Sequence, residues 1–285
     1  MTSARTHTTT VLVEGLRFPE GPRWHEGRLV LSDMHDARVL AVDPDGTVST
    51  VVEVPEWPSG LGWDPDGHLL VVSMRDRRVL RVEDGALVPF ADLSALAPFH
   101  CNDMVVDSRG GAYVGNFGFD LDAGADPVPT VLVRVEPDGT ARVAAEDLAF
   151  PNGSVITPDG ATLIVGETFA GRLSAWTITE DGSLTDRRVW AQLEGAVPDG
   201  ICLDADGAIW VACPISGRVL RVLEGGEVTD VVTVDRNGAF ACMLGGADGR
   251  TLHICTADSS RPAETGSRRG AVEVCTVEVP GAGRP

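Results

Sequence analysis

The fold can be predicted from a segment that reads Gly62-Trp-Asp-Pro-Asp-Gly67-His-Leu-Leu-Val-Val-Ser73. Its Asp-Pro-Asp-Gly sequence is typical of a tight turn, because glycine adopts the positive φ that such a turn needs. The apolar run that follows is short and bounded by polar residues, as expected for a buried β-strand. The segment therefore predicts a β-hairpin.

The same turn-plus-strand pattern occurs six times along the chain. The turn glycines are Gly27, Gly67, Gly110, Gly160, Gly207 and Gly249. Successive glycines lie 40 to 50 residues apart, which is the length of four short strands with their turns and the size of a propeller blade. The repeat predicts an all-β fold, a six-bladed β-propeller with four-stranded antiparallel blades, and it disfavours a β-sandwich of unrelated hairpins.

Residues 13–280 are expected to form this single propeller domain, and residues 1–12 a flexible N-terminal tail, since the start of the chain is polar and rich in threonine. The tail lacks the apolar stretch of a signal peptide, and no later run approaches the length of a membrane span. A cytoplasmic protein is expected. A monomer is also expected, because a closed propeller has no exposed edge that demands a partner.

The composition excludes several classes of function. The formal net charge is −19, so the surface should repel nucleic acids and anionic membranes. The chain contains no lysine, which excludes lysine Schiff-base chemistry and the lysine-dependent phosphate loop. None of the six cysteines forms a C-x-x-C pair, and several lie in apolar runs, so buried free thiols are expected.

Polar residues recur at one position of the repeat, seven or eight places before the turn glycine, where the innermost strand of a blade begins. Four of these six positions carry a carboxylate or an amide: Glu20, Asn102, Asn152 and Asp199. Oxygen ligands that converge on one axis favour a hard cation, and the absence of sulfur and imidazole favours Ca²⁺, Mg²⁺ or Mn²⁺ over structural zinc. Asn-Gly and Asp-Gly also form turns without any ligand, which is the alternative interpretation.

Five motifs resemble those of the gluconolactonase / senescence marker protein (regucalcin) family. They are Phe18-Pro-Glu-Gly-Pro-Arg-Trp24, His100-Cys-Asn-Asp-Met-Val-Val-Asp107, Pro151-Asn-Gly-Ser-Val-Ile-Thr-Pro-Asp-Gly160, Pro198-Asp-Gly-Ile-Cys-Leu-Asp204 and Cys242-Met-Leu-Gly-Gly-Ala-Asp-Gly-Arg-Thr-Leu252. The resemblance extends from Val13 to Thr256. It implies a six-bladed propeller that carries one divalent cation at its mouth and hydrolyses a small-molecule lactone.

The resemblance also implies roles for single residues. The family's metal ligands correspond to Glu20, Asn152 and Asp199, and its substrate-facing asparagine corresponds to Asn102. Asp199 also matches the aspartate that transfers protons. Ca²⁺ is the expected ion, with Mn²⁺, Zn²⁺ and Mg²⁺ as alternatives. The cation would polarise the lactone carbonyl, and Asp199 would pass a proton from water to the leaving alkoxide.

This chain departs from the family next to Asn102. It reads Phe99-His100-Cys101 where sugar-lactone members often carry an arginine. His100 is expected to orient the substrate and is an alternative base. Phe117 is expected to contact the substrate on a rim that also includes the aromatic residues Trp57, Phe169 and Phe240, which is more apolar than a sugar lactone requires.

Two other functions remain open from the sequence. The first is a metal-dependent esterase or tailoring enzyme that acts on an apolar cyclic substrate at the same site. The second is a non-enzymatic calcium-binding propeller that serves as an interaction platform, since a fold alone does not fix a function.

Overall fold

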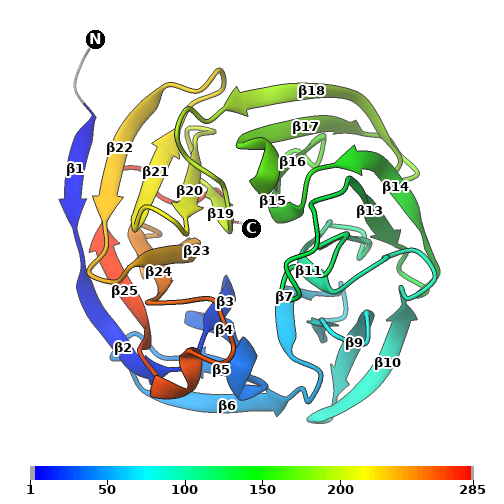
Figure 1. The fold of residues 1–285 in the computed structure, drawn as a ribbon, viewed down its shortest axis with the longest axis horizontal. Coiled ribbons are helices and arrows are strands. Elements are labelled where there is room, and N and C mark those ends of the chain that lie inside the picture. Colours follow the sequence, from blue (N-terminus) through cyan, green and yellow to red (C-terminus); the bar gives the residue numbers. More distant parts are fainter. Residues whose placement is uncertain (1–3, 284–285) are drawn as a thin grey trace.

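The computed structural model describes residues 4–283 and confirms the six-bladed β-propeller, in which the blades surround a central channel (Figure 1). The innermost strands are β3 (Pro19–His25), β7 (Pro58–Trp63), β11 (Cys101–Val106), β15 (Pro151–Ile156), β19 (Ile201–Leu203) and β23 (Gly238–Gly245). The second strands are β4 (Arg28–Asp33), β8 (Leu69–Ser73), β12 (Ala112–Asn116), β16 (Thr162–Glu167), β20 (Ile209–Cys213) and β24 (Thr251–Ala257). The third strands are β5 (Arg38–Val42), β9 (Arg78–Glu83), β13 (Thr130–Val135), β17 (Arg172–Ile178), β21 (Arg218–Val222) and β25 (Gly270–Thr276).

The outermost strands show how the ring closes. Five of them follow their blades in sequence: β6 (Val48–Glu53), β10 (Ala86–Asp92), β14 (Ala141–Leu148), β18 (Leu184–Gln192) and β22 (Val228–Thr233). The sixth is β2 (Thr10–Leu16), which pairs antiparallel with β25 and so joins the N-terminal segment to the last blade. Strand β1 (Arg5–Thr8) pairs parallel with β22 and gives that blade a fifth strand (Figure 1).

These two strands correct the flexible tail expected over residues 1–12. Residues 1–3 of that segment lie outside the described residues, but Arg5–Thr8 and the first part of β2 belong to the sheets. Threonine is a strand-forming residue, and polar side chains tie the segment down. The imidazole Nε2 of His7 lies 2.9 Å from Oδ1 of Asp230, and the hydroxyl of Thr9 donates to Glu273. The segment is polar because its strands lie on the outside of the propeller, and polarity there does not indicate flexibility.

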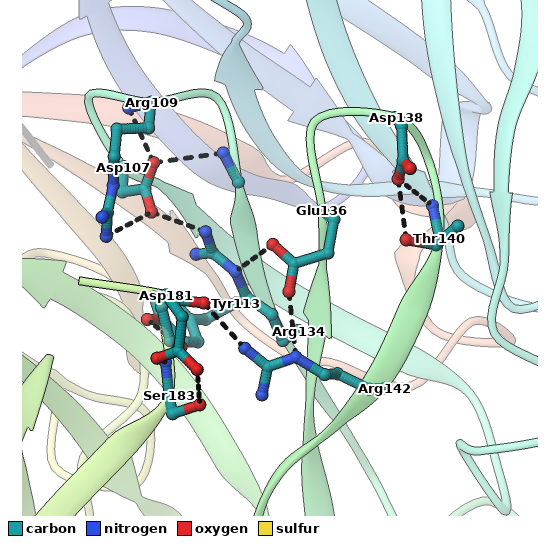
Figure 2. Close-up of polar contacts among 12 residues, drawn as sticks. Asp107, Arg109, Tyr113, Arg134, Glu136, Asp138, Thr140, Arg142, Asp181 and Ser183 are labelled. Atoms are coloured by element: carbon teal, nitrogen blue, oxygen red, sulfur yellow. Dashed lines mark hydrogen bonds and ion pairs between the residues drawn. The ribbon is translucent and has the colours of Figure 1, made fainter. Parts of the chain in front are cut away.

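The hairpin turns are stabilised by an arginine–aspartate pair that recurs in the second, third and fifth blades. In the second blade, Nη1 of Arg81 lies 3.9 Å from Oδ2 of Asp64. In the third blade, Oδ1 of Asp107 accepts hydrogen bonds from the backbone amides of Arg109 and Gly111, while Nη2 of Arg134 lies 2.8 Å from Oδ2 (Figure 2). The fifth blade repeats this arrangement with Nε of Arg221 donating to Asp204 at 2.6 Å. These pairs lie at the turns between the first and second strands, which is the end of the channel away from the strand starts.

The helical elements within residues 4–283 are three short 3₁₀ turns, η1 (Met34–Asp36), η2 (Thr168–Ala170) and η3 (Thr265–Ser267). None of them is long and apolar enough to cross a membrane. Each connects the second strand of a blade to its third strand. These connections end near the starts of the innermost strands, so they build the mouth of the channel.

The interior consists of apolar clusters between neighbouring blades. Trp210, for example, is 1% exposed and packs in the cluster that joins the last blade to its neighbours. All six cysteines are buried and free, which confirms the expectation from their spacing. Burial raises the pKa of the thiols of Cys101, Cys213, Cys242, Cys255 and Cys275, that of Cys101 to about 12, which is typical of inert packing residues.

Candidate functional site

A cavity of about 900 Å³ opens at the mouth of the channel. It is lined by Glu20, Asn102, Asn152 and Asp199, the four polar residues that recur in the sequence repeat. His100 and Phe117 line the same cavity. The structure thus brings together all six residues for which the sequence predicted a metal-binding, catalytic or substrate-binding role.

Most of the innermost strands have a β-bulge near their start, close to these side chains. The pairing of β3 with β4 shifts between Glu20 and Arg23, and that of β15 with β16 shifts between Pro151 and Ser154. Such bulges bend a strand and re-aim its side chains. Strands β7, β11 and β23 show the same shift near their starts. The bulges thus lie where Glu20, Asn102 and Asn152 reach the mouth of the channel.

The glycines that follow these residues are required by close packing between blades. A Cβ on Gly153 would lie 2.5 Å from the backbone nitrogen of Ile201, and one on Gly200 would lie 2.5 Å from the Cβ of Ala241. Gly153 lies inside β15 rather than in a turn, and neither glycine has a positive φ. The alternative interpretation of Asn-Gly and Asp-Gly as turn formers is therefore wrong at these positions.

Two carboxylates dominate the electrostatics of the cavity. Burial and the nearby charge of Asp199 raise the pKa of Glu20 well above its ordinary value, although the Gly21 amide opposes this. Burial raises the pKa of Asp199 to about 8, with a contribution from Asp103, while the Asn152 side chain acts in the opposite direction. Within residues 4–283 neither Glu20 nor Asp199 forms an ion pair with a basic side chain. An all-oxygen donor set with uncompensated negative charge fits a hard divalent cation.

The raised pKa of Asp199 predicts how the stability of the metal-free protein changes with pH. Because the folded state holds this proton up to about pH 8 and the unfolded chain releases it near pH 4, stability falls as pH rises through this range. Histidines with lowered pKa values, such as His35 at about 4, act in the opposite direction only below about pH 6.5. The free energy of unfolding should therefore fall by about 2 kcal/mol between about pH 6.5 and pH 8.

Urea unfolding of metal-free protein at several pH values measures this change. The variant Asp199→Asn should make the profile shallower in this range, because it removes one of the two buried carboxylates with raised pKa values while keeping its volume. Asp206, a largely exposed aspartate in the turn of the same blade, provides the matched control Asp206→Asn, which should keep the slope. A wild-type profile that is flat or rises from pH 6.5 to pH 8 would contradict the prediction.

The two asparagines are oriented for different tasks. Nδ2 of Asn152 donates to Oγ1 of Thr168 at 3.2 Å, and Thr168 in turn donates to the carbonyl of Pro198 at 2.8 Å. This bond leaves the amide oxygen of Asn152 available as a ligand. In Asn102 the amide oxygen accepts from Ser59 at 3.4 Å, which leaves its NH₂ group available to donate.

A buried ion pair lies next to the polar residues of the cavity. Nη2 of Arg23 on β3 contacts Oδ1 of Asp103 on β11 at 2.7 Å. The same guanidinium donates to the backbone carbonyls of Leu61 and Met104. It thereby links the innermost strands of three successive blades. Asp103 raises the pKa values of both Glu20 and Asp199, and Arg23 opposes this effect at Glu20.

His100 and Phe117 lie among aromatic rings. The imidazole of His100 stacks on Phe99 with ring centroids 4.1 Å apart and meets the edge of Phe117 at 6.0 Å. Phe117 stacks on Phe150 at 4.5 Å. Burial lowers the pKa of His100, so the ring is neutral near pH 7. It can orient a substrate or accept a proton, and both roles stay predictions.

A second group of potential metal ligands lies elsewhere. Asp64, Asp66 and His68 have ligand atoms within 4.8 Å of one another, but they belong to the turn between β7 and β8. Oδ1 of Asp64 accepts from the backbone amides of Asp66 and His68 at 3.0 and 2.8 Å. The turns at Asp107 and Asp204 use their aspartates in the same way. This cluster is explained by turn structure.

Sequence reasoning missed a second set of cavity residues, those directly after the second strand of each blade. All six line the cavity: Met34, Met74, Phe117, Thr168, Pro214 and Asp258. Only Phe117 was singled out in the sequence. The signal was nonetheless present, because these residues follow the turn glycines by seven to nine places.

Comparisons with known proteins show the family of this chain. Residues 18–258 match the SMP-30/Gluconolactonase/LRE-like region. A 6-deoxy-6-sulfogluconolactonase from Pseudomonas putida is 30% identical over 277 residues, which cover 93% of this chain and 93% of that protein. The solved structure of a gluconolactonase from Xanthomonas campestris is 26% identical with a TM-score of 0.77, covering 96% of this chain and 89% of its own.

A further solved structure shares the fold. The calcium-binding protein regucalcin from Agrobacterium tumefaciens has a TM-score of 0.83 at 21% identity, with 99% of both chains covered. The family match includes the starts of all six innermost strands, and it therefore contains the four polar residues of the cavity. The chain belongs to the SMP-30/gluconolactonase/LRE-like family.

Proposed function

We propose that the protein is a divalent-cation-dependent lactonase that opens a small-molecule cyclic ester. The observation that carries the proposal is the meeting of Glu20, Asn152 and Asp199 in one cavity, where the two carboxylates have raised pKa values and no basic partner among the described residues. Relatives named as lactonases support the choice of reaction.

Glu20, Asn152 and Asp199 would hold the cation. Ca²⁺ is the expected ion, because carboxylate and amide oxygens are its preferred ligands and regucalcin, which shares the fold, is a calcium-binding protein. Mn²⁺, Zn²⁺ and Mg²⁺ are alternatives. When bound, the cation would supply Lewis-acid polarisation of the lactone carbonyl.

The protein's own residues perform the remaining steps. Asp199 accepts the proton of the attacking water and delivers it to the alkoxide that leaves when the ring opens. The NH₂ group of Asn102, whose oxygen is already engaged by Ser59, donates to an oxygen of the substrate. His100 and Phe117 form the adjoining wall and orient the ring.

The reaction is tested by following acid release with a pH indicator. Metal-stripped protein is refilled with Ca²⁺, Mn²⁺, Zn²⁺ or Mg²⁺ and is offered sugar lactones and apolar γ- and δ-lactones. Cation-dependent hydrolysis is the expected result. Tight binding of one cation without turnover of any lactone would instead favour a calcium-binding propeller, or an enzyme that acts on another cyclic electrophile.

Cation binding should also stabilise the fold. At a free cation concentration about 100 times its Kd, the free energy of unfolding is expected to rise by about 2.7 kcal/mol. Thermal unfolding at pH 8 with and without Ca²⁺ measures this gain. Glu20→Gln, which removes one ligand charge, should reduce it strongly, whereas Glu227→Gln in the hairpin loop before β22 should retain it. Equal gains in both variants would show that the cation binds elsewhere.

A further inference from the structure

The wall of the cavity has a repeated composition on the side of the first four blades. The residues directly before the innermost strands are Phe18, Trp57, His100 and Phe150, and those directly after the second strands are Met34, Met74, Phe117 and Thr168. All eight line the cavity. Six of them are phenylalanine, tryptophan or methionine, and each of these four blades contributes at least one. The surface around the oxygen ligands is therefore mostly apolar on this side.

Two polar side chains on this wall, Thr168 and His35, already have partners, whereas the ring of His100 is held by stacking and stays available to a substrate. The hydroxyl of Thr168 donates to Pro198, and Nδ1 of the buried His35 pairs with Thr265 at 2.9 Å while its ring stacks on Phe18. A buried hydroxyl without a hydrogen-bond partner destabilises a complex. A polyhydroxylated ring would therefore find few partners on this side of the cavity.

The charges of the cavity also select against an anionic substrate. Among the described residues that line it, the only arginine is Arg261, whose side chain is 80% exposed. Negative groups include Glu20 and Asp199 within the cavity and Asp122 and Asp258 among its lining residues. With the cation bound, the charges of Glu20 and Asp199 are compensated, but a carboxylate, sulfonate or phosphate on the substituent would meet Asp122 and Asp258 without a buried cationic side chain.

Apolar surface continues from the cavity to its rim. Phe169 is 49% exposed and Ile215 is 81% exposed, and both line the cavity. Phe169 meets Phe150 at a ring-centroid distance of 5.2 Å, and Phe150 stacks on Phe117. Exposed apolar side chains gathered at one place indicate a binding surface. These rings form a continuous aromatic wall from Phe117 through Phe150 to Phe169.

We propose that the substrate is an uncharged lactone that carries an apolar substituent, an alkyl, acyl or aryl group, in place of ring hydroxyls. This inference rests on the proposed lactonase function. The ester group lies at the oxygen ligands, and the substituent extends along the aromatic wall toward the rim. The cavity volume of about 900 Å³ lies within the range of sites that enclose drug-sized ligands, and it leaves room for such a substituent.

A series of γ-lactones with unbranched alkyl chains tests the inference on the cation-loaded protein. From γ-butyrolactone through γ-hexalactone and γ-octalactone to γ-decalactone, kcat/KM should rise by up to about fourfold for each methylene that is buried. D-Glucono-δ-lactone should be slower than δ-decalactone by about 10²-fold. The variant Phe169→Ser should lower the ratio of kcat/KM for γ-decalactone to that for γ-butyrolactone by about tenfold. The matched control is Val189→Ser, an equally exposed apolar residue on β18 away from the cavity (54% exposed), which should leave the ratio unchanged.

The corresponding γ-lactams resist hydrolysis, so calorimetry measures their binding independently of the reaction. A Kd that falls with chain length supports the substrate class even if no lactone is hydrolysed, and in that case only the lactonase function is lost. Hydrolysis that prefers sugar lactones and does not depend on chain length would overturn the substrate class while keeping the lactonase. Absence of both lactam binding and chain-length dependence would also overturn the class.

Discussion

Replacing Asp199 with asparagine is expected to lower kcat/KM for the best lactone by about 10³-fold or more. Asparagine keeps the volume of the side chain and one carbonyl oxygen toward the cation, but it cannot accept the proton of the attacking water. Proton transfer by a positioned side chain contributes about 10²- to 10⁴-fold to a rate. Asp199 is 8% exposed, so bulk water cannot easily replace it.

The comparison with Glu20→Gln separates proton transfer from cation binding. Glu20 is expected to act only as a ligand, so its variant should regain activity when excess Ca²⁺ restores occupancy. Asp199→Asn should stay inactive at saturating Ca²⁺, with the bound metal verified by elemental analysis. The control Asp206→Asn changes a turn aspartate of the same blade and should keep full activity.

Two outcomes would contradict the assigned role of Asp199. Recovery of Asp199→Asn by excess cation would reduce it to a ligand. His100 would then become the candidate base, because burial keeps its ring neutral near pH 7. Activity of Asp199→Asn close to that of the wild type without added cation would remove it from the mechanism altogether.

The fold and the polar residues of the cavity were predictable from the sequence because both follow the period of the repeat. The Asp-Gly turns fix where each blade begins, and counting back from them finds Glu20, Asn102, Asn152 and Asp199. Counting forward from the same glycines would have found Met34, Met74 and Thr168, and with them the apolar wall.

The features that sequence reasoning missed depend on contacts between blades. Strand β1 lies beside β22, more than 200 residues later in the chain, and only the closed ring brings them together. The glycines after Asn152 and Asp199 were open to a turn interpretation, since their steric partners belong to the next blade. Arg23 was read only as part of a motif, because its partner Asp103 is 80 residues away.

Replacing Arg23 with methionine is expected to destabilise the protein by about 3–5 kcal/mol, the usual effect of removing one partner of a buried ion pair. The Arg23 residue is 3% exposed and Asp103 is 7% exposed, so methionine would leave a buried carboxylate without its cation. Two backbone carbonyls, those of Leu61 and Met104, would lose their donor as well. Urea unfolding of metal-free protein at pH 7 measures the loss.

Three comparisons make the cause identifiable. The exposed pair Arg188–Glu224, at 3.0 Å, supplies the control Arg188→Met, which should cost less than about 1 kcal/mol. The double variant Arg23→Met/Asp103→Leu should recover part of the loss, because it removes the unpaired buried charge.

The third comparison is the pH dependence of the loss. Burial already raises the pKa of Asp103 in the presence of Arg23. Without Arg23 the folded state holds that proton to higher pH, so the loss should grow between pH 5 and pH 8. A loss in Arg23→Met that is independent of pH and equal to that in Arg188→Met would show that the pair does not hold the three blades together.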